Sequence, residues 1–479
     1  MNIILIVSDT LRRDFLGCYG NGWIRTPNID RLAQESIIFD KAYTASFPTV
    51  PHRRDLVTGR YTFTYSDWSP LPLDEKVMAD SLRKAGYVTM LIADTLHIFK
   101  DGYHFDRGYD GWIWIRGQEN DRYSTAPIDY RFPCNTQKLR SPYDSMRQYL
   151  RNVSERRYES DYFVARTMTE AARWLEQNRK HERFFLHVDT FDPHEPWDPP
   201  RWYVDLYDPG YEGEEVTYPA YGPCNNLTPE ELKHTRALYA GEVTMVDSWV
   251  GYLLRRVDEL GLRENTTIVF TTDHGFYLGE RNLIGKSIIT ESTMSLVPLY
   301  SEVAHIPLII RVPGARPSRN EALVQPPDLM PTILELAEAE APETMQGTSL
   351  LPLVRKENVA WRGLAVSSPS LIHGPIAGQR VSVITKEWFL IYCGQISRAL
   401  REAPPERRTK IVDGLERLQK ITGERPRNEL YCLPKDPAQT NDVLNENRDV
   451  AEQLHVELVR LLEAMGTRKE VLNYWRRLE

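Results

Sequence analysis

Five short apolar segments are spaced along the chain, at residues 3–7, 88–92, 184–188, 268–270 and 306–312. Each is rich in β-branched residues, is too brief for a helix and lacks the alternation of a half-exposed strand. Such segments are typical of strands that are buried on both faces of a parallel sheet. We therefore expect a central sheet in which most strands run parallel.

Helix-like segments lie between these strands, and the clearest covers about residues 230–260. Its apolar residues recur at three- and four-residue spacing: Leu238, Val246, Trp249, Val250, Leu253 and Val257. Thr228 and Pro229 are suited to its cap and first turn. Strands that alternate with helices predict a three-layer α/β domain over residues 1–365.

Residues 366–479 follow a different pattern and predict a smaller α+β domain. We expect a hairpin of residues 381–385 and 388–393, a strand at 429–433 and a helix at 448–464. Two long stretches before this domain, 101–158 and 197–226, lack periodicity. Loops of this length in a compact domain are usually functional or mobile. Their many Tyr and Trp residues could line a leaving-group pocket or anchor the loops to the core.

Polar clusters follow four of the predicted strands directly: Ser8-Asp9-Thr10, Asp94-Thr95-Leu96-His97, Asp192-Pro193-His194 and Thr272-Asp273-His274-Gly275. In open α/β sheets, ligands bind at the carboxyl ends of the strands. Carboxylates gathered there would repel one another unless a positive charge lay among them, and a divalent cation is the simplest candidate. The alternative is that each Asp only caps the helix that follows it.

A second candidate lies between Ser46 and Gly59. Pro51 fits the first turn of a helix that Gly59 would end, which puts Thr49 at or just before the amino end of that helix. Free N–H groups and the helix dipole favour an anion there. Thr49 could act as a nucleophile or simply cap the helix, and the local sequence alone favours the cap.

Composition excludes several classes of protein. The chain has 479 residues, 41% of them hydrophobic, and 59 Lys+Arg against 67 Asp+Glu give a net charge of −8. This composition is that of a globular protein. The absence of a basic tract argues against a nucleic-acid partner.

The cysteines and the apolar segments bear on location. Five cysteines without Cys-x-x-Cys spacing argue against a disulfide framework or zinc knuckle and favour a reducing compartment. No segment approaches the roughly 20 apolar residues that cross a bilayer. We expect a cytoplasmic protein with no membrane partner, and homo-oligomerisation is left open.

Many short motifs also occur in an order that a known family shares. They cover residues 2–9, 16–20, 26–33, 49–53, 58–59, 192–194, 272–275, 285–286 and 429–431. On these motifs the chain resembles the sulfatase family of the alkaline phosphatase superfamily. The resemblance implies a three-layer α/β domain with a central mixed sheet, and a smaller carboxyl-terminal domain with an antiparallel sheet.

Carried over residue by residue, the resemblance implies one divalent metal ion. Asp9, Asp273 and His274 match its ligands, and Thr49 matches a nucleophile that also contacts it. Oxygen-rich ligands with one imidazole favour Ca²⁺ or Mn²⁺, while Mg²⁺ and Zn²⁺ are left open.

The resemblance also implies the catalytic residues. Thr49 matches the nucleophile and Arg53 the arginine that steadies it. Lys286 matches a lysine on the substrate anion. His194 and His97 match histidines of the same site, and either could protonate the leaving alcohol.

Three departures separate the chain from typical sulfatases. Those enzymes oxidise a Cys or Ser to formylglycine, but Thr49 cannot form that aldehyde and instead resembles the unmodified threonine of phosphodiesterases in the superfamily. Thr10 stands where many sulfatases carry a second Asp, which favours one metal over two. Thr95 replaces a lysine, as in phosphonate monoester hydrolases.

These departures favour phosphorus over sulfur. We expect a metal-dependent hydrolase that cleaves a small anionic ester, either a phosphodiester or a phosphonate monoester, through Thr49. Thr95 and Arg12 are candidate substrate-binding residues. Two alternatives stay open: a sulfatase that acts on sulfate esters, and a weakly active or non-catalytic relative that binds an anion.

Overall fold

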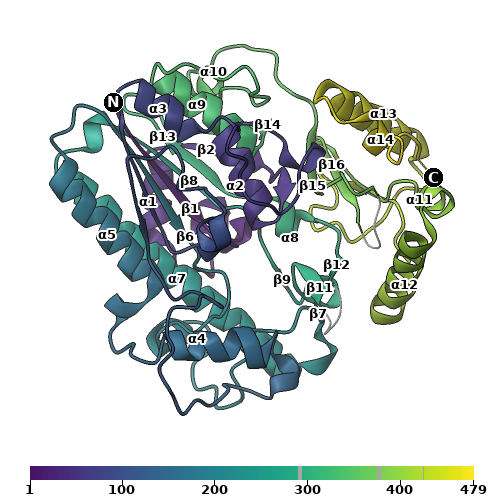
Figure 1. The fold of residues 1–479 in the computed structure, drawn as a ribbon, viewed down its shortest axis with the longest axis horizontal. Coiled ribbons are helices and arrows are strands. Elements are labelled where there is room, and N and C mark those ends of the chain that lie inside the picture. The colour runs from purple at the N-terminus through teal and green to yellow at the C-terminus, as the bar shows by residue number, and fades with distance from the viewer. Residues whose placement is uncertain (290–293, 375–378, 424, 479) are drawn as a thin grey trace.

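The fold is built on two β-sheets, seen in the computed structural model, which describes residues 1–289, 294–374, 379–423 and 425–478 (Figure 1). The larger sheet has eight strands in the order β14-β2-β13-β8-β1-β6-β4-β5. They are β1 (Asn2–Ser8), β2 (Ile37–Ala42), β4 (Val88–Ala93), β5 (Gly111–Trp114), β6 (Phe184–Thr190), β8 (Thr266–Thr271), β13 (Leu308–Arg311) and β14 (Ser318–Val324).

The pairing confirms a mixed, mostly parallel sheet. Strands β8, β1, β6, β4 and β5 run parallel, and only β13 runs antiparallel to both of its neighbours. All five predicted apolar segments form strands of this sheet. Strands β2, β5 and β14 were not predicted. Strands β5 and β14 lie at edges of the sheet and carry half-exposed residues, and the short apolar run of β2 is interrupted by Asp40 and Lys41.

Each face of the large sheet is covered by its own helices. Ile4 and Ile6 of β1 pack against α1 (Pro27–Gln34), α5 (Phe163–Asn178) and α7 (Pro229–Glu259). The alternate residues of β1 pack against α3 (Met78–Lys84), α9 (Leu329–Leu336) and α10 (Leu351–Val354) on the other face. This double burial explains why β1 is apolar at nearly every position.

Helix α7 begins as the sequence predicts. The Thr228 hydroxyl accepts a hydrogen bond from Glu231 N at 3.2 Å, and the Glu231 carboxylate accepts one from Thr228 N at 3.0 Å. Pro229 occupies the first turn. This capping box fixes the start of the longest helix in the described part of the chain.

The second sheet has the order β18-β17-β16-β15-β3. It contains β3 (Ser46–Phe47), β15 (Ala365–Pro369), β16 (Val381–Ile384), β17 (Trp388–Tyr392) and β18 (Glu429–Cys432). The predicted hairpin and third strand are confirmed, and α13 (Arg448–Ala464) matches the predicted helix. Strand β3 pairs parallel with β15, so the segment before Thr49 belongs to this sheet.

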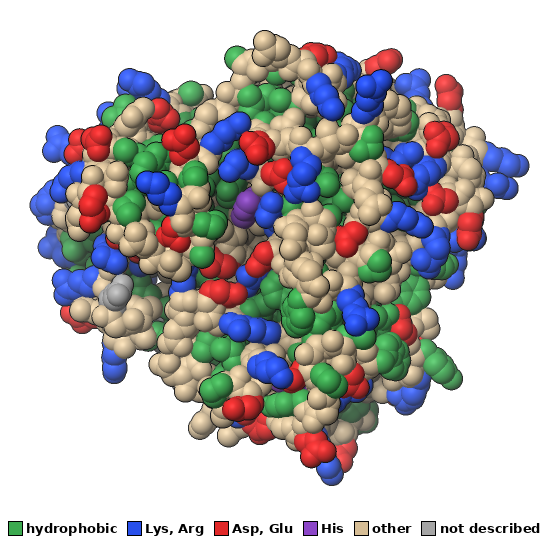
Figure 2. Space-filling model, turned by 180° about the vertical axis from the view of Figure 1, so that it is seen from behind, with side chains coloured by type: hydrophobic (Ala, Val, Ile, Leu, Met, Phe, Trp, Pro, Cys, Tyr) green, Lys and Arg blue, Asp and Glu red, His purple; other side chains and the backbone are tan. Residues whose placement is uncertain are grey.

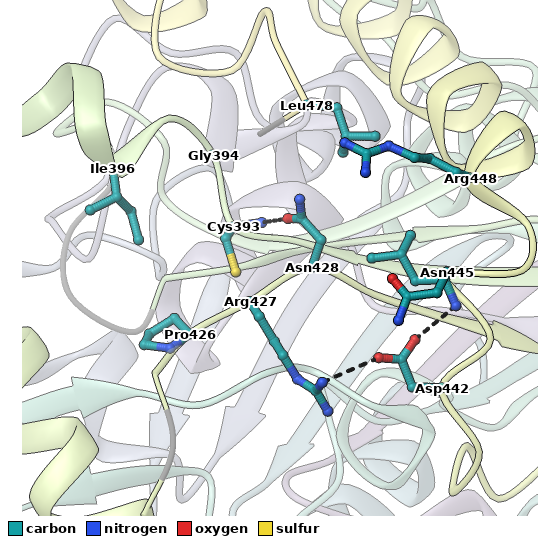
Figure 3. A pocket seen from close by; sticks show the side chains of 11 residues that line it. Cys393, Gly394, Ile396, Pro426, Arg427, Asn428, Asp442, Asn445, Arg448 and Leu478 are labelled. Atoms are coloured by element: carbon teal, nitrogen blue, oxygen red, sulfur yellow. Dashed lines mark hydrogen bonds and ion pairs between the residues drawn. The ribbon is translucent and has the colours of Figure 1, made fainter.

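Two helices of the smaller domain, α11 (Ile396–Glu402) and α12 (Pro405–Thr422), lie on its outer side (Figure 1). A cavity of about 410 Å³ also lies in this domain, lined by Cys393, Arg427, Asp442 and Arg448 among others (Figure 3). Arg427 is turned toward Asp442 across it, 3.7 Å away. None of the predicted site residues lines this cavity.

Two further features of the surface are plain. Acidic and basic side chains are interspersed over the face shown in Figure 2, in keeping with the absence of a basic tract. Among the described residues, no helix combines the length and the apolar character that crossing a membrane requires.

Gly59 ends helix α2 (Thr49–Thr58) in the left-handed region, with φ of +65°. A β-carbon there would overlap the Met345 side chain. We expect Gly59→Ala to lower stability by roughly 1–3 kcal/mol and to lower the midpoint of thermal unfolding. The matched control is Gly86→Ala, which has φ of +84° and no neighbour near the added carbon. Equal shifts in the two variants would show that the Met345 contact is unimportant.

Candidate active site

Four neighbouring strands bring their polar ends to one edge of the large sheet. In the order β8-β1-β6-β4, Val7 of β1 pairs with Thr271 of β8 and with Asp189 of β6. The residues that follow β1 and β8 therefore emerge beside Asp189. This register places Asp9, Asp273 and His274 together.

The cluster fits a divalent cation. One ligand atom from each of Asp9, Asp273 and His274 lies within 4.8 Å of the others, and all three residues are buried. His274 Nδ1 bonds to the Gly275 carbonyl at 3.0 Å, which leaves Nε2 as the ligand nitrogen. Burial and the charge of Asp273 raise the pKa of Asp9 well above its ordinary value. A bound cation would relieve that cost, and the donor set suits one.

The backbone at Thr10 is strained next to this cluster. Its φ of +61° is unusual for a β-branched residue. Thr10 N donates to Asp273 Oδ1 at 2.9 Å, and its hydroxyl donates to Asp9 Oδ1 at 2.7 Å. Tyr239 holds the turn by donating to the Thr10 carbonyl at 2.8 Å. Thr10 therefore orients both carboxylates, which was not predicted.

Gly275 is required by a close approach of two backbones. A β-carbon at this position would overlap the carbonyl oxygen of Glu302. Gly275 N donates to the Val303 carbonyl at 2.8 Å, which fixes the turn after His274.

Thr49 is the first residue of α2, as predicted, and is buried. No hydrogen bond to its hydroxyl is found in the part of the chain that the structure describes. Phe47 contacts the His274 ring, with centroids 5.0 Å apart, and Arg53 lies one turn further along α2. Because residues four apart share a helix face, Thr49 is bracketed by contacts to the cation cluster.

Arg53 is surrounded by three buried carboxylates. Nη1 lies 2.9 Å from Asp9 Oδ2 and also pairs with Asp273. Nε and Nη2 form a bidentate pair with Asp189, at 3.1 and 2.9 Å. Thr95 donates to Asp189 Oδ1 at 2.6 Å. Thr95, predicted to bind the substrate, therefore orients the Asp189 carboxylate, which in turn orients Arg53.

Asp189 was missed at the sequence level. It lies inside β6, one residue past an apolar run, and looked like an ordinary strand end. The feature that could have revealed Asp189 is a carboxylate at the end of a fully buried strand, β6, which pairs with β1.

Lys286 returns to the cluster as predicted. It follows the short strand β10 (Leu283–Gly285), and its Nζ lies 3.3 Å from His274 Nε2. Among the described residues, Lys286 has no carboxylate within 4 Å.

His194 and His97 differ in their surroundings. His194 is buried, and Nδ1 bonds to the Glu195 carbonyl at 2.8 Å. Burial and the charge of Lys286 lower the pKa of His194 well below its ordinary value. His97 lies in the 3-10 helix η4 (Leu96–Ile98), which contacts α2, and its Nε2 is 3.4 Å from Glu119 Oε2.

Two of the four strand-end clusters do not join the cation ligands. Asp94 accepts a hydrogen bond from Phe191 N at 2.7 Å, and Asp192 accepts one from Gln118 at 2.6 Å. Burial and the charge of Asp192 raise the pKa of Asp94 well above its ordinary value. These two residues form a separate buried acidic pair.

Arg12 has other partners than a substrate. Its guanidinium bonds to Asp14, to Glu280 at 2.8 Å and to the Phe276 carbonyl at 3.0 Å. Among the described residues, no contact joins it to the cation cluster. Its predicted role in substrate binding stays a prediction.

Most of the loop aromatics serve as anchors. Trp197 is fully buried against Tyr239 and Phe276. Trp112 and Trp114 stack on Phe99, although Trp112 is half exposed. Anchoring explains Trp197, whereas a pocket-lining role of the half-exposed Trp112 stays a prediction.

The family follows from comparison with known proteins. A family model described as Sulfatase matches residues 1–339. The chain belongs to the sulfatase family. An arylsulfatase from Clostridium perfringens is 28% identical over 415 residues, which cover 75% of this chain and 80% of the relative. A multifunctional alkaline phosphatase superfamily protein, PehA from Trinickia caryophylli, is 27% identical over 425 residues, covering 75% and 78%.

Solved structures agree with the fold of this sulfatase family member. The phosphonate monoester hydrolase of Agrobacterium radiobacter superimposes with a TM-score of 0.70 and 19% identity, covering 97% of this chain and 95% of that one. At this identity the likeness establishes the fold alone.

Removing a ligand carboxylate should abolish the gain in stability from a metal. Mn²⁺ or Ca²⁺ should raise the midpoint of thermal unfolding of the chelator-treated wild type, because the cation offsets repulsion among buried carboxylates. Asp273→Asn should lose most of that rise. Asp14→Asn, at an exposed carboxylate that pairs with Arg12, is the control and should keep it. An undiminished rise in Asp273→Asn would place the cation elsewhere.

Asp189→Asn should reduce kcat/KM by on the order of 10–100-fold, because Arg53 loses the bidentate partner that orients it. Thr95→Val removes only the hydrogen bond to Asp189 and should cost a few-fold. Steady-state kinetics on one ester substrate would measure both. A larger loss in Thr95→Val than in Asp189→Asn would contradict the arrangement.

Proposed function

We propose that this protein is a metal-dependent hydrolase that cleaves phosphodiesters or phosphonate monoesters through Thr49. The observation that carries the proposal is a threonine hydroxyl at the start of α2, bracketed by contacts to the cation cluster. A threonine cannot be oxidised to the aldehyde on which sulfate-ester hydrolysis in this family depends, whereas its hydroxyl can attack phosphorus unmodified.

The bound cation would be held by Asp9, Asp273 and His274, with Thr49 beside it. When bound, it supplies a positive charge that lowers the pKa of a nearby hydroxyl and polarises a phosphoryl oxygen. Thr49 gives up its hydroxyl proton to solvent and Oγ attacks phosphorus in line, so that the new O–P bond forms while the bond to the alcohol breaks and its electron pair leaves with the alcohol oxygen. Lys286 stabilises the charge on the equatorial oxygens, while Arg53 holds the carboxylates of the site in place. Water then hydrolyses the phosphothreonine.

The charges of the site support a singly charged ester. Arg53 is already balanced by the bidentate pair with Asp189. Lys286 then offers one uncompensated positive charge to the substrate. A phosphodiester or a phosphonate monoester carries one negative charge, whereas a phosphate monoester carries about two near neutral pH. The multifunctional relative at 27% identity is compatible with activity on more than one ester class.

Sulfate-ester hydrolysis is the second candidate, favoured by the family and by the arylsulfatase at 28% identity. A sulfate monoester also carries a single charge, so charge alone does not separate it from the first candidate. The nucleophile separates the two candidates. In a sulfatase without the aldehyde, water would have to displace Thr49 from sulfur directly.

The test compares matched 4-nitrophenyl esters with the metal-loaded wild type. We expect turnover of a phosphodiester and a phosphonate monoester at least about 10-fold faster than of a sulfate monoester or a phosphate monoester. Thr49→Ala should lose on the order of 1,000-fold or more, and Thr49→Ser should retain measurable activity. Mass spectrometry of quenched wild type should find the phosphoryl adduct on Thr49. Sulfate turnover alone would overturn the proposal.

A further inference from the structure

A cavity of about 340 Å³ lies between the two domains and has no part in the mechanism above. One wall comes from the 3-10 helix η11 (Glu280–Asn282) and from β10 of the large domain, and another comes from β18 and the end of α12. None of the candidate active-site residues lines this cavity. Small ligands often bind at domain interfaces, in cavities of this size.

The charged residues that line the cavity are mostly basic. Glu429 is the single acidic residue of the lining, whereas the basic ones are Arg281, Arg380, Arg425 and Arg427. The whole chain carries a net charge of −8, so these arginines form a local excess of positive charge. A cavity with such an excess attracts anions.

The Glu429 carboxylate is largely occupied by other groups. Its Oε2 accepts a hydrogen bond from the Tyr300 hydroxyl and another, at 2.7 Å, from the Tyr431 hydroxyl. Its Oε1 lies 3.8 Å from Nη1 of Arg380, which is longer than a hydrogen bond. Glu429 therefore attracts Arg380 without satisfying the N–H groups of its guanidinium.

Arg380 is the residue that points most directly to a ligand. Its side chain is only 11% exposed, and its Nε is buried with no hydrogen-bond partner among the described residues. A buried N–H group without a partner is costly. An anion in the cavity would supply the missing acceptor and a charge of the opposite sign.

Two further arginines add charge to the lining. Arg427 is 60% exposed and lies 3.7 Å from Asp442, again beyond hydrogen-bond distance (Figure 3). Arg425 Nε donates to Gln419 at 2.8 Å, and this neutral partner does not offset the charge of Arg425. The positive charge of the cavity is therefore only partly balanced by the protein.

The rest of the wall is fixed in place and apolar. Arg281 donates to the carbonyls of Gln439 and Ala438, at 2.9 and 3.0 Å, which ties η11 to the smaller domain. Apolar side chains complete the lining: Leu283, Leu296, Val297, Leu418 and Ile421. A ligand that fits both parts of the lining has an anionic group and an apolar body.

We propose that this cavity binds a small organic anion, with its anionic group on Arg380 and its apolar body against Leu296 and Leu418. A guanidinium binds a planar or tetrahedral oxyanion through paired N–H···O bonds. Arg425 and Arg427 add long-range attraction. The site is separate from the candidate active site, and the inference does not depend on the proposed function.

Isothermal titration calorimetry with naphthalene-2-sulfonate tests the proposal, because this probe joins a permanent negative charge to a flat apolar body. The metal-loaded wild type should bind it with a Kd below about 1 mM. Naphthalene-2-sulfonamide has a similar shape without the charge, and inorganic sulfate has the charge without the apolar body. Each should bind at least about 10-fold more weakly than the sulfonate.

Arg380→Gln should weaken binding of the sulfonate by about 10-fold or more, because a charge-assisted hydrogen bond is lost. Arg427→Gln, at an exposed position, gives a second test and should weaken binding by about threefold or more. The matched control is Arg398→Gln, at a partly exposed arginine of α11 that pairs with Glu402 at 2.8 Å and lies outside the cavity lining. It should keep the affinity within about twofold.

Lys286→Ala separates this cavity from the candidate active site, which also carries a positive charge. The variant should bind the sulfonate within about twofold of the wild type. Thermal unfolding of each variant checks that it folds. Equal binding of sulfonate and sulfonamide, unchanged affinity in both Arg380→Gln and Arg427→Gln, or loss of binding in Lys286→Ala would overturn the proposal. Ester turnover is not measured, so failure of the proposed function would leave this result unaffected.

Discussion

The candidate site depends on the packing of three carboxylates around one guanidinium at the end of a parallel sheet. Asp9, Asp189 and Asp273 are all fully buried, and each contacts Arg53. Removing that many charges from water is costly unless they are paired, and one arginine leaves two negative charges uncompensated. A bound divalent cation would complete the balance. The left-handed Thr10, the glycine after His274 and the anchoring by Tyr239 all hold ligands in this arrangement.

The same balance shapes what the site can accept. Arg53 is bound on several sides by carboxylates of the protein, and Lys286 is left as the positive group without a carboxylate partner among the described residues. With a divalent cation bound, the charges of the three carboxylates, Arg53 and the cation would cancel, and Lys286 would add one positive charge. In the proposed function, selection of a substrate by its charge would depend on Asp189, which balances Arg53.

The sequence predicted the parts that repeat a strong local pattern. Fully apolar strands, the Thr228 cap and the Pro51 to Gly59 helix are each determined by residues close together in the chain, and all are present. Strand β5 and helix α12 were missed because their residues are half exposed and carry no clear periodicity. The grouping of Asp9, Asp273 and His274 could be predicted because strand ends converge by topology. The roles of Asp189 and Glu119 could not be predicted. Asp189 binds Arg53, which lies 136 residues away in the chain. Glu119 faces His97, 22 residues away, from a loop whose shape is set by tertiary contacts.

Strand β3 has a consequence for how the two sheets depend on each other. Ser46 and Phe47 pair with β15, and the Ser46 hydroxyl and N–H both bond to Asp55 of α2. The candidate nucleophile therefore starts a helix whose preceding strand is an edge of the smaller sheet. A chain that ended before β15 would leave β3 unpaired, and the segment that precedes α2 would lose its support. The smaller sheet thus helps to position the start of α2 at the candidate site, and the two sheets depend on each other there.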